Sequence, residues 1–294
     1  MPRPDFDPHV HATVRRMLPR PIPPFPNERV DSYIRRLQIA NGLHKPGLIP
    51  LIPLGQSAPA ILQALTQLTG RDPHALTHAL PELNTSQRHT GRETRQACKL
   101  CAARRADTQT LPISLYSPYQ HTVCRRHRRW LGNQGAQIPL PPSPATNQIL
   151  SANKHHRRLA SQNTNALAAE SYQLARFIIW RWLDHGIQFA SITARLDDLL
   201  PHGKRPWPDQ SPLHAAIYPN IITLTQIIAH PRWETIIYHD NPDEHETLWS
   251  KIAAEVTDGY RPTHHRDPLQ TLINNRKYLL HLDRRKQASN LSNP

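Results

Sequence analysis

Apolar residues repeat with the period of an α-helix over much of the chain. In the segment NERVDSYIRRLQIANG, one stripe has members at i, i+3, i+4 and i+7, namely Val30, Tyr33, Ile34 and Leu37. This spacing predicts an amphipathic helix. Asn27 is expected to cap its first turn, and Asn41-Gly42 supplies a left-handed stop.

Two shorter helical patterns follow. APAILQALTQLTG predicts a helix that Gly70 ends, and Asp72-Pro73 provides the cap and first residue of a third helix, HALTHAL. A helix, a glycine turn and a short capped helix are typical of a helix-turn-helix, and equally of an ordinary helical hairpin. The third helix has no row of Arg, Asn or Gln suited to base edges, so the pattern alone does not predict DNA reading.

The second half of the chain is also predicted to be helical. LAAESYQLARFIIWRWLDHG is apolar enough for a core helix, and the residues expected inside are Tyr172, Leu174, Phe177, Ile178, Trp180 and Trp182. FASITARLDDLLP and LHAAIYPNIITLTQIIAHP predict two more helices. DEHETLWSKIAAEVTDGY predicts another, whose acidic start suits the helix dipole. A last helix is expected at LQTLINNRKYLLHL.

Proline marks the boundaries between these patterns. Eight of the first 26 residues are proline, which predicts an extended arm, and IPLPPSPAT at 138–146 reads as a linker. The expected fold is mainly α with a small zinc-ribbon β element. Its expected parts are a proline-rich arm (1–27), a helix-turn-helix-like domain (28–94), a zinc ribbon (95–137), a linker (138–150), a C-terminal helical domain (151–262) and a polar basic tail (263–294).

The cysteines provide the candidate chemistry. All three fall in one window: Cys98 and Cys101 in CKLC, then Cys124 followed by His127 in CRRH. Two pairs with two-residue spacing are typical of a closed tetrahedral Cys₃His site for one structural Zn²⁺. A disulfide would leave one thiol over. His121 is a rival fourth ligand, but His127 completes the second pair.

Charge is segregated along the chain. The total is 36 Lys and Arg against 22 Asp and Glu, a formal +14, which favours a polyanionic partner. Residues 95–131 hold eight Lys or Arg and one acid, whereas residues 240–258 hold six acids and one lysine. The candidate nucleic-acid contacts are Arg104, Arg105, Arg125, Arg126, Arg128, Arg129, Lys154, Arg157 and Arg158.

Other classes of protein lack support in the sequence. An apolar run long enough for a membrane span is missing, the first residues lack the apolar region of a secretory signal, and three cysteines suit a cytoplasmic setting. No G-x-S-x-G elbow or phosphate loop occurs, and the paired acids lie at expected helix ends. We expect a chain that is not an enzyme.

Two motifs together resemble the TniQ family of transposition target-selection proteins, which includes the TnsD type. The first is LPRPIPPFPNERVDSYIRRLQIANG, in which the matching positions are Leu18, Pro19, Glu28, Ser32, Tyr33, Arg36, Leu37, Ala40, Asn41 and Gly42. The second is CKLC, SLYSPYQHTV and CRRHRRWL in that order. Lys99 and Arg125 depart from the family's pattern, because they replace the usual prolines of the two knuckles. The resemblance covers about the first 130 residues.

The resemblance implies a non-catalytic adaptor that helps choose where a mobile element inserts. The implied partners are DNA, an AAA+ regulator, in some members a CRISPR surveillance complex, and a second copy through helix-turn-helix contacts. A protein-protein interaction module that docks such partners without reading DNA is the alternative, as is a domesticated DNA-binding regulator.

Overall fold

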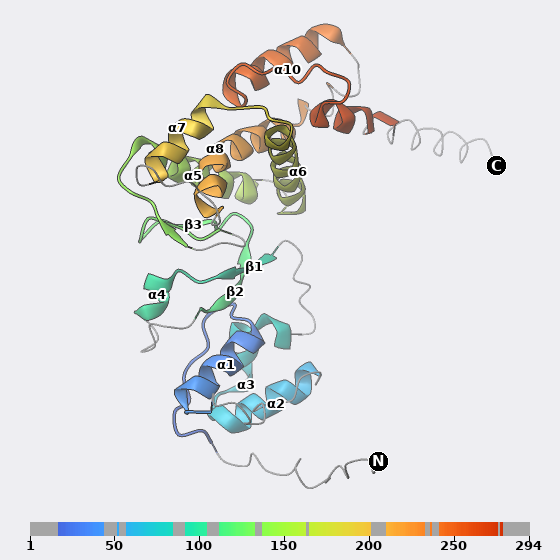
Figure 1. The fold of residues 1–294 in the computed structure, drawn as a ribbon. Helices are drawn as coiled ribbons and strands as arrows, with labels where there is room; N and C mark the ends of the chain where they lie inside the picture. Colours follow the sequence, from blue (N-terminus) through green and yellow to red (C-terminus); the bar gives the residue numbers. More distant parts are fainter. Residues whose placement is uncertain are drawn as a thin grey trace, which may run out of the picture. The chain divides into compact units, whose positions relative to one another are not determined.

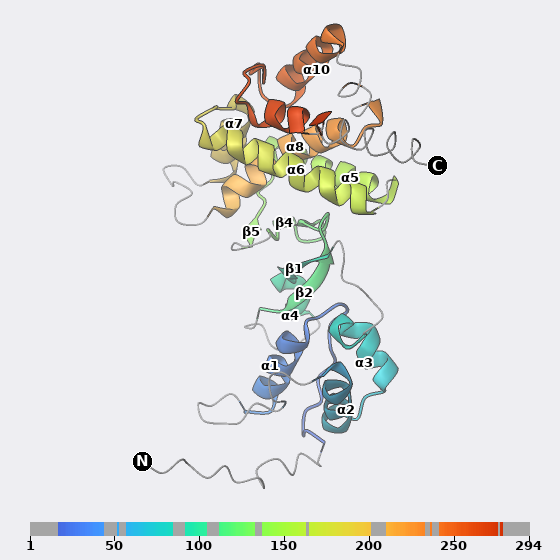
Figure 2. The same ribbon diagram turned by 90° about the vertical axis from the view of Figure 1, so that its right-hand side faces the viewer.

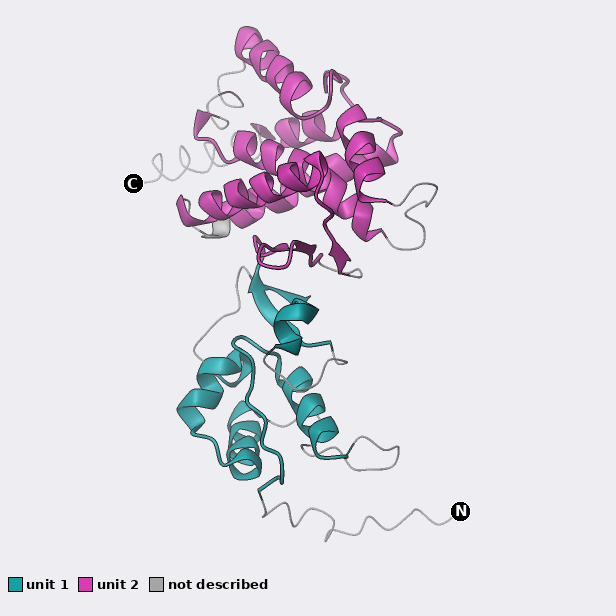
Figure 3. Ribbon diagram, turned by 90° about the vertical axis from the view of Figure 1, so that its left-hand side faces the viewer, with its two compact units in different colours: residues 1–118 teal, residues 119–294 magenta. Residues whose placement is uncertain are grey.

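The structure is a computed structural model that describes residues 17–43, 52, 57–84, 92–104, 112–132, 137–162, 165–200, 210–232, 236, 241–275 and 277–278. Within these residues the chain is mainly helical with few strands (Figure 1). It divides into two compact units, residues 1–118 and 119–294, each described by itself (Figure 3). The division falls inside the range expected for the ribbon.

Unit 1 has an apolar core between short helices. These are α1 (Val30–Ala40), α2 (Ala58–Thr69), α3 (Pro73–Ala79) and the 3-10 turn η2 (Pro81–Leu83). Their inward side chains are fully buried: Tyr33, Leu37, Leu65, Leu68, Leu76 and Leu80. The predicted end of α2 is confirmed, since Gly70 takes φ +64° there. So is the cap of α3, where Asp72 Oδ2 accepts the Ala75 N–H at 2.9 Å.

The expected cap of α1 is wrong. Asn27 turns the chain with φ +61° and α1 starts after Arg29, which gives no side-chain cap. The carboxylate of Glu82, far along the chain, accepts the Val30 N–H at 2.8 Å and so satisfies the first turn. Glu82 also accepts the Tyr116 hydroxyl, and burial followed by this hydrogen bond raises the pKa of Tyr116 to about 12.

The described part of the proline arm, residues 17–27, is a strap along unit 1. It is held through its backbone: Leu18 N–H donates to the Leu68 carbonyl at 2.8 Å, and the Tyr33 hydroxyl donates to the Ile22 carbonyl at 2.9 Å. Leu18 and Phe25 are buried. The carbonyls of a proline-rich segment do not pair with a neighbouring strand. Side chains such as Tyr33 therefore supply the hydrogen-bond donors for them. Residues 1–16 of the predicted arm lie outside the described residues.

A two-stranded sheet completes unit 1. β1 (Arg92–Gln96) pairs antiparallel with β2 (Ser114–Pro118), and the short α4 (Lys99–Ala103) follows β1. A small core of Phe25, Ala102 and Ile113 lies beside them. The arm thereby packs against the segment that carries the first cysteine pair.

Unit 2 has a second, larger core. Its strands β3 (Val123–Cys124), β4 (Arg129–Trp130) and β5 (Ile138–Pro139) form an antiparallel sheet in that order. Its helices are α5 (Pro144–Gln162), α6 (Asn165–Asp184), α7 (Ala190–Leu199), α8 (Ser211–Ile228) and α10 (Pro242–Glu255). α8 packs against α5, α6 and α7, and it continues through Pro219.

The core prediction for α6 is wrong in one residue. Tyr172, Ile178 and Trp182 are buried as expected, whereas Phe177 is 57% exposed. The helical period explains the difference, because Phe177 follows Tyr172 by five residues and therefore points to the other side of the helix.

Buried polar groups join the strands of unit 2 to its helices. Asn153 Nδ2 donates to the Gln120 carbonyl at 2.9 Å and lies 3.3 Å from the Tyr218 hydroxyl. His156 Nδ1 lies 2.8 Å from the same hydroxyl, and Trp130 of β4 meets the Tyr218 ring edge-on. The segment before β3 is thus fixed to α5 and α8.

Arg195 is a buried cation that ties α7 to α8. Its guanidinium donates to the Ala216 carbonyl at 2.7 Å and to the Asn220 side chain. Burial lowers the pKa of Arg195 to about 10. Among the helices of the described residues, none combines the length and apolar character needed to cross a bilayer.

Candidate metal centre

The first cysteine pair sits where β1 passes into α4. Ala97 N–H donates to the Ile113 carbonyl at 2.7 Å, which closes the sheet just before Cys98. Cys98 is the N-cap residue of α4, and its carbonyl accepts the Ala102 N–H at 2.9 Å. This turn brings Cys101 round to the same side as Cys98, as the two-residue spacing predicts.

The second pair occupies the turn between β3 and β4. Cys124 ends β3 and pairs with Arg129 across the turn. Arg128, directly after His127, has φ +43°, a left-handed conformation that non-glycine residues adopt at a cost. This tight turn holds Cys124 and His127 next to each other.

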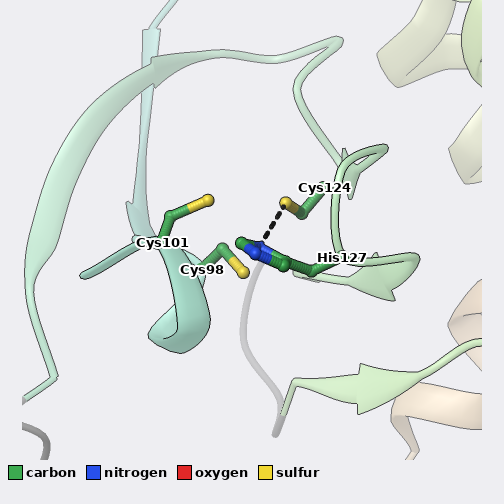
Figure 4. Close-up of side chains that lie close together, drawn as sticks. All are labelled: Cys98, Cys101, Cys124 and His127. Atoms are coloured by element: carbon green, nitrogen blue, oxygen red, sulfur yellow. Dashed lines mark hydrogen bonds between the residues drawn. The ribbon is translucent and has the colours of Figure 1, made fainter. Parts of the chain in front are cut away.

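The structure groups these four side chains, and Figure 4 shows them pointing toward one another. The three sulfurs and one imidazole nitrogen all lie within 4.8 Å of one another. Cys98 is buried, and the other three are partly buried. His127 belongs to the group and the rival His121 does not. The predicted ligand set of Cys98, Cys101, Cys124 and His127 could hold one metal ion.

The two side chains of the second pair form a hydrogen bond, and their spacing also fits a shared metal ion. Cys124 Sγ lies 3.6 Å from His127 Nδ1. A tetrahedral ion with bonds of about 2.3 Å to sulfur and about 2.0–2.1 Å to nitrogen would place these two atoms about 3.6 Å apart. The cysteines form no disulfide. Three thiolates and an imidazole are soft or borderline donors, typical of a closed site without an open position.

Most predicted nucleic-acid contacts that the structure describes are exposed. Arg104 follows α4 in unit 1, and Arg125, Arg126 and Arg128 lie in the β3–β4 turn. Lys154, Arg157 and Arg158 are exposed on α5, where the helical period places them within an arc of about 100°. Arg105 lies outside the described residues.

Arg129 differs from the other predicted contacts. It is 9% exposed, and its guanidinium donates to the Gln137 carbonyl at 2.8 Å. The side chain therefore holds β4 to the segment that leads into β5. Arg129 is not part of the exposed basic surface of unit 2.

No protein-family model matches the chain, and no curated protein or solved structure is significantly similar to it.

The sequence did not single out a buried ion pair in unit 1. The Arg36 guanidinium donates to both Glu28 carboxylate oxygens, through Nε at 2.8 Å and Nη2 at 2.7 Å. Nη2 also donates to the Pro23 carbonyl at 2.9 Å, and Phe25 N–H donates to Glu28. The proline run itself could have indicated this contact, because its backbone carbonyls need hydrogen-bond donors from other parts of the chain.

Proposed function

We propose that this chain is a non-catalytic, DNA-associated adaptor for transposition target-site selection, of the TniQ type. In this proposal Cys98, Cys101, Cys124 and His127 hold one structural Zn²⁺ in a zinc ribbon, and α1 to α3 form a helix-turn-helix-like domain. The observation that carries it is the four-ligand group, because the same two knuckles carry the resemblance.

The role of the metal in this proposal is structural. Four protein ligands fill a tetrahedral zinc ion and leave no position for water or substrate. The ion would fix the two knuckles, whose strands are only two to five residues long. The exposed arginines of the second knuckle would then be held on a rigid turn.

DNA contact is proposed for the basic residues of unit 2. The β3–β4 turn contributes Arg125, Arg126 and Arg128, and α5 contributes Lys154, Arg157 and Arg158. The hydrogen bond from Asn153 to Gln120 ties α5 to the segment before that turn. Arginine and lysine at these positions would bind phosphates without reading sequence.

Replacing Lys154, Arg157 and Arg158 together by alanine is expected to weaken duplex binding. Each cation removed from a phosphate should reduce the slope of log affinity against log salt by about one. Gel shifts over a salt series measure this slope. Lys251→Ala, an exposed lysine on the acidic α10, is the matched control and should leave binding unchanged. If the unmodified chain retards no DNA at about 50 mM salt, direct DNA contact is wrong.

A second candidate function is protein docking without DNA reading, to an AAA+ regulator or a CRISPR surveillance complex. One observation favours it: a cavity of about 890 Å³ between α8 and α10. Its lining combines the apolar Ile227 and Leu248 with charges of both signs, namely Asp243, Glu244, Glu255, Arg232 and Lys251. Such a cavity suits an amphipathic segment of a partner that carries charges of both signs.

Charge reversal on α10 separates the two functions. We expect Asp243→Lys combined with Glu255→Lys to lower capture of an AAA+ regulator from a TniQ-type system at least tenfold, while DNA retardation does not weaken. Pull-down with purified proteins provides the measurement. Arg261→Ala is the control, because it breaks an exposed ion pair between Arg261 and Glu246. Capture that the charge reversal leaves unchanged would count against this surface. So would capture that Arg261→Ala lowers to the same extent.

A further inference from the structure

α6 carries apolar side chains on its solvent side. Phe177 is 57% exposed and Leu167 is 45% exposed, and the half-buried Leu174 lies between them. These residues follow one another at spacings of seven and three, so they share one side of the helix. Figure 2 shows α6 running along the face of unit 2 that is turned toward the viewer.

Two exposed charges bracket Leu174 and Phe177 on this side of the helix. Glu170 lies four residues before Leu174, and Arg181 lies four residues after Phe177. The helical period places Glu170, Leu174, Phe177 and Arg181 within an arc of about 60°. Within the part of the chain that the structure describes, neither Glu170 nor Arg181 forms an ion pair.

These four residues can pair with the same four residues of a second α6 that runs in the opposite direction. In an antiparallel pair of α6 helices, Glu170 would face the partner's Arg181 and Leu174 would face the partner's Phe177. The two-fold axis repeats both contacts, which gives two ion pairs around two apolar contacts. Two charges of the same sign at these two positions would instead face each other across the axis and repel.

We propose that α6 is a self-association surface, on which a second copy of this chain packs its own α6 antiparallel through Leu174 and Phe177. Helices crossing at about 20° stay in contact over the three turns between Glu170 and Arg181. This surface is different from the helix-turn-helix contacts that the family resemblance implies, and it does not depend on DNA binding.

The expected dimer is weak. A single helix pair buries less than the roughly 800 Å² per partner of a standard stable interface, so we expect a dissociation constant in the micromolar range. The exposed aromatic ring supplies most of the affinity, as in other interface centres. The bracketing charges fix the antiparallel register.

Sedimentation equilibrium between about 1 μM and 1 mM protein tests the proposal. Phe177→Ser should raise the dissociation constant at least tenfold without loss of helical circular dichroism, because the ring is exposed. Glu170→Arg alone and Arg181→Glu alone should each weaken self-association, since each places like charges opposite each other. The double variant should restore it.

A mixing experiment distinguishes this register from any other effect of the substitutions. Glu170→Arg carries two arginines on the stripe and Arg181→Glu carries two glutamates, so the two variants should form a mixed dimer more tightly than either forms with itself. A chain that stays monomeric throughout the concentration range overturns the proposal. So does a dimer that these substitutions leave unchanged.

Discussion

Cys101→Ser is expected to abolish binding of the single metal ion and to unfold both knuckles. Sulfur at this position is one of four donors within 4.8 Å of one another, and a hydroxyl is a much poorer ligand for a soft or borderline ion. A structural zinc ion contributes on the order of 10 kcal/mol to the folding of its local unit. The apolar core beside the first knuckle, Phe25, Ala102 and Ile113, is too small to replace it.

Two measurements test the effect of Cys101→Ser. Elemental analysis should give one zinc per chain for the unmodified protein and none for Cys101→Ser. Hydrogen exchange with mass spectrometry should show faster exchange at 92–104 and 121–130 and unchanged protection in α8. Leu100→Ser, an exposed neighbour between the two ligands, should keep the metal. His127→Cys should also keep it, as a Cys₄ site. Pure protein without zinc would refute the assignment.

The members of each candidate ligand pair could be predicted from sequence because their spacing is local. A turn of four residues brings both members of a pair to one side, whatever the rest of the chain does. The choice of His127 over His121 follows the same rule, and His127 is the histidine that lies in the group that could hold an ion. The helices of unit 1 were predictable for a similar reason, since an apolar stripe, Gly70 and Asp72 each act within a few residues.

What the sequence missed depends on contacts between distant positions. Glu82 caps α1 from more than fifty residues away, which no local pattern indicates. Phe177 was assigned to the core because α6 is apolar overall, but the arc of helix that faces α8 is decided by tertiary packing. Arg129 was grouped with exposed arginines of the same run, yet it lies on a strand that turns it inward.

Arg36→Ala is expected to destabilise unit 1 by about 3–5 kcal/mol, because it leaves the Glu28 carboxylate buried without its cation. Both side chains are inaccessible, at 3% and 0% exposure. Glu28 would keep the Ser32 hydroxyl and Phe25 N–H as donors, and these do not neutralise its charge. The arm would also lose the donor to the Pro23 carbonyl and the guanidinium stacked 4.7 Å from the Phe25 ring centre.

Hydrogen exchange of the α1 amides is the suitable measurement, since residues 1–118 contain no tryptophan to report unfolding. Arg35→Ala is the matched control: the same residue type, one position earlier on α1 and exposed, so it should change stability by no more than about 0.5 kcal/mol.

Arg36→Lys should recover only part of the loss, because a lysine cannot bind both carboxylate oxygens as a planar fork. Glu28→Gln combined with Arg36→Met should cost less than Arg36→Ala alone, since no buried charge remains. Equal protection of α1 in Arg36→Ala and Arg35→Ala would show that the ion pair does not hold the arm.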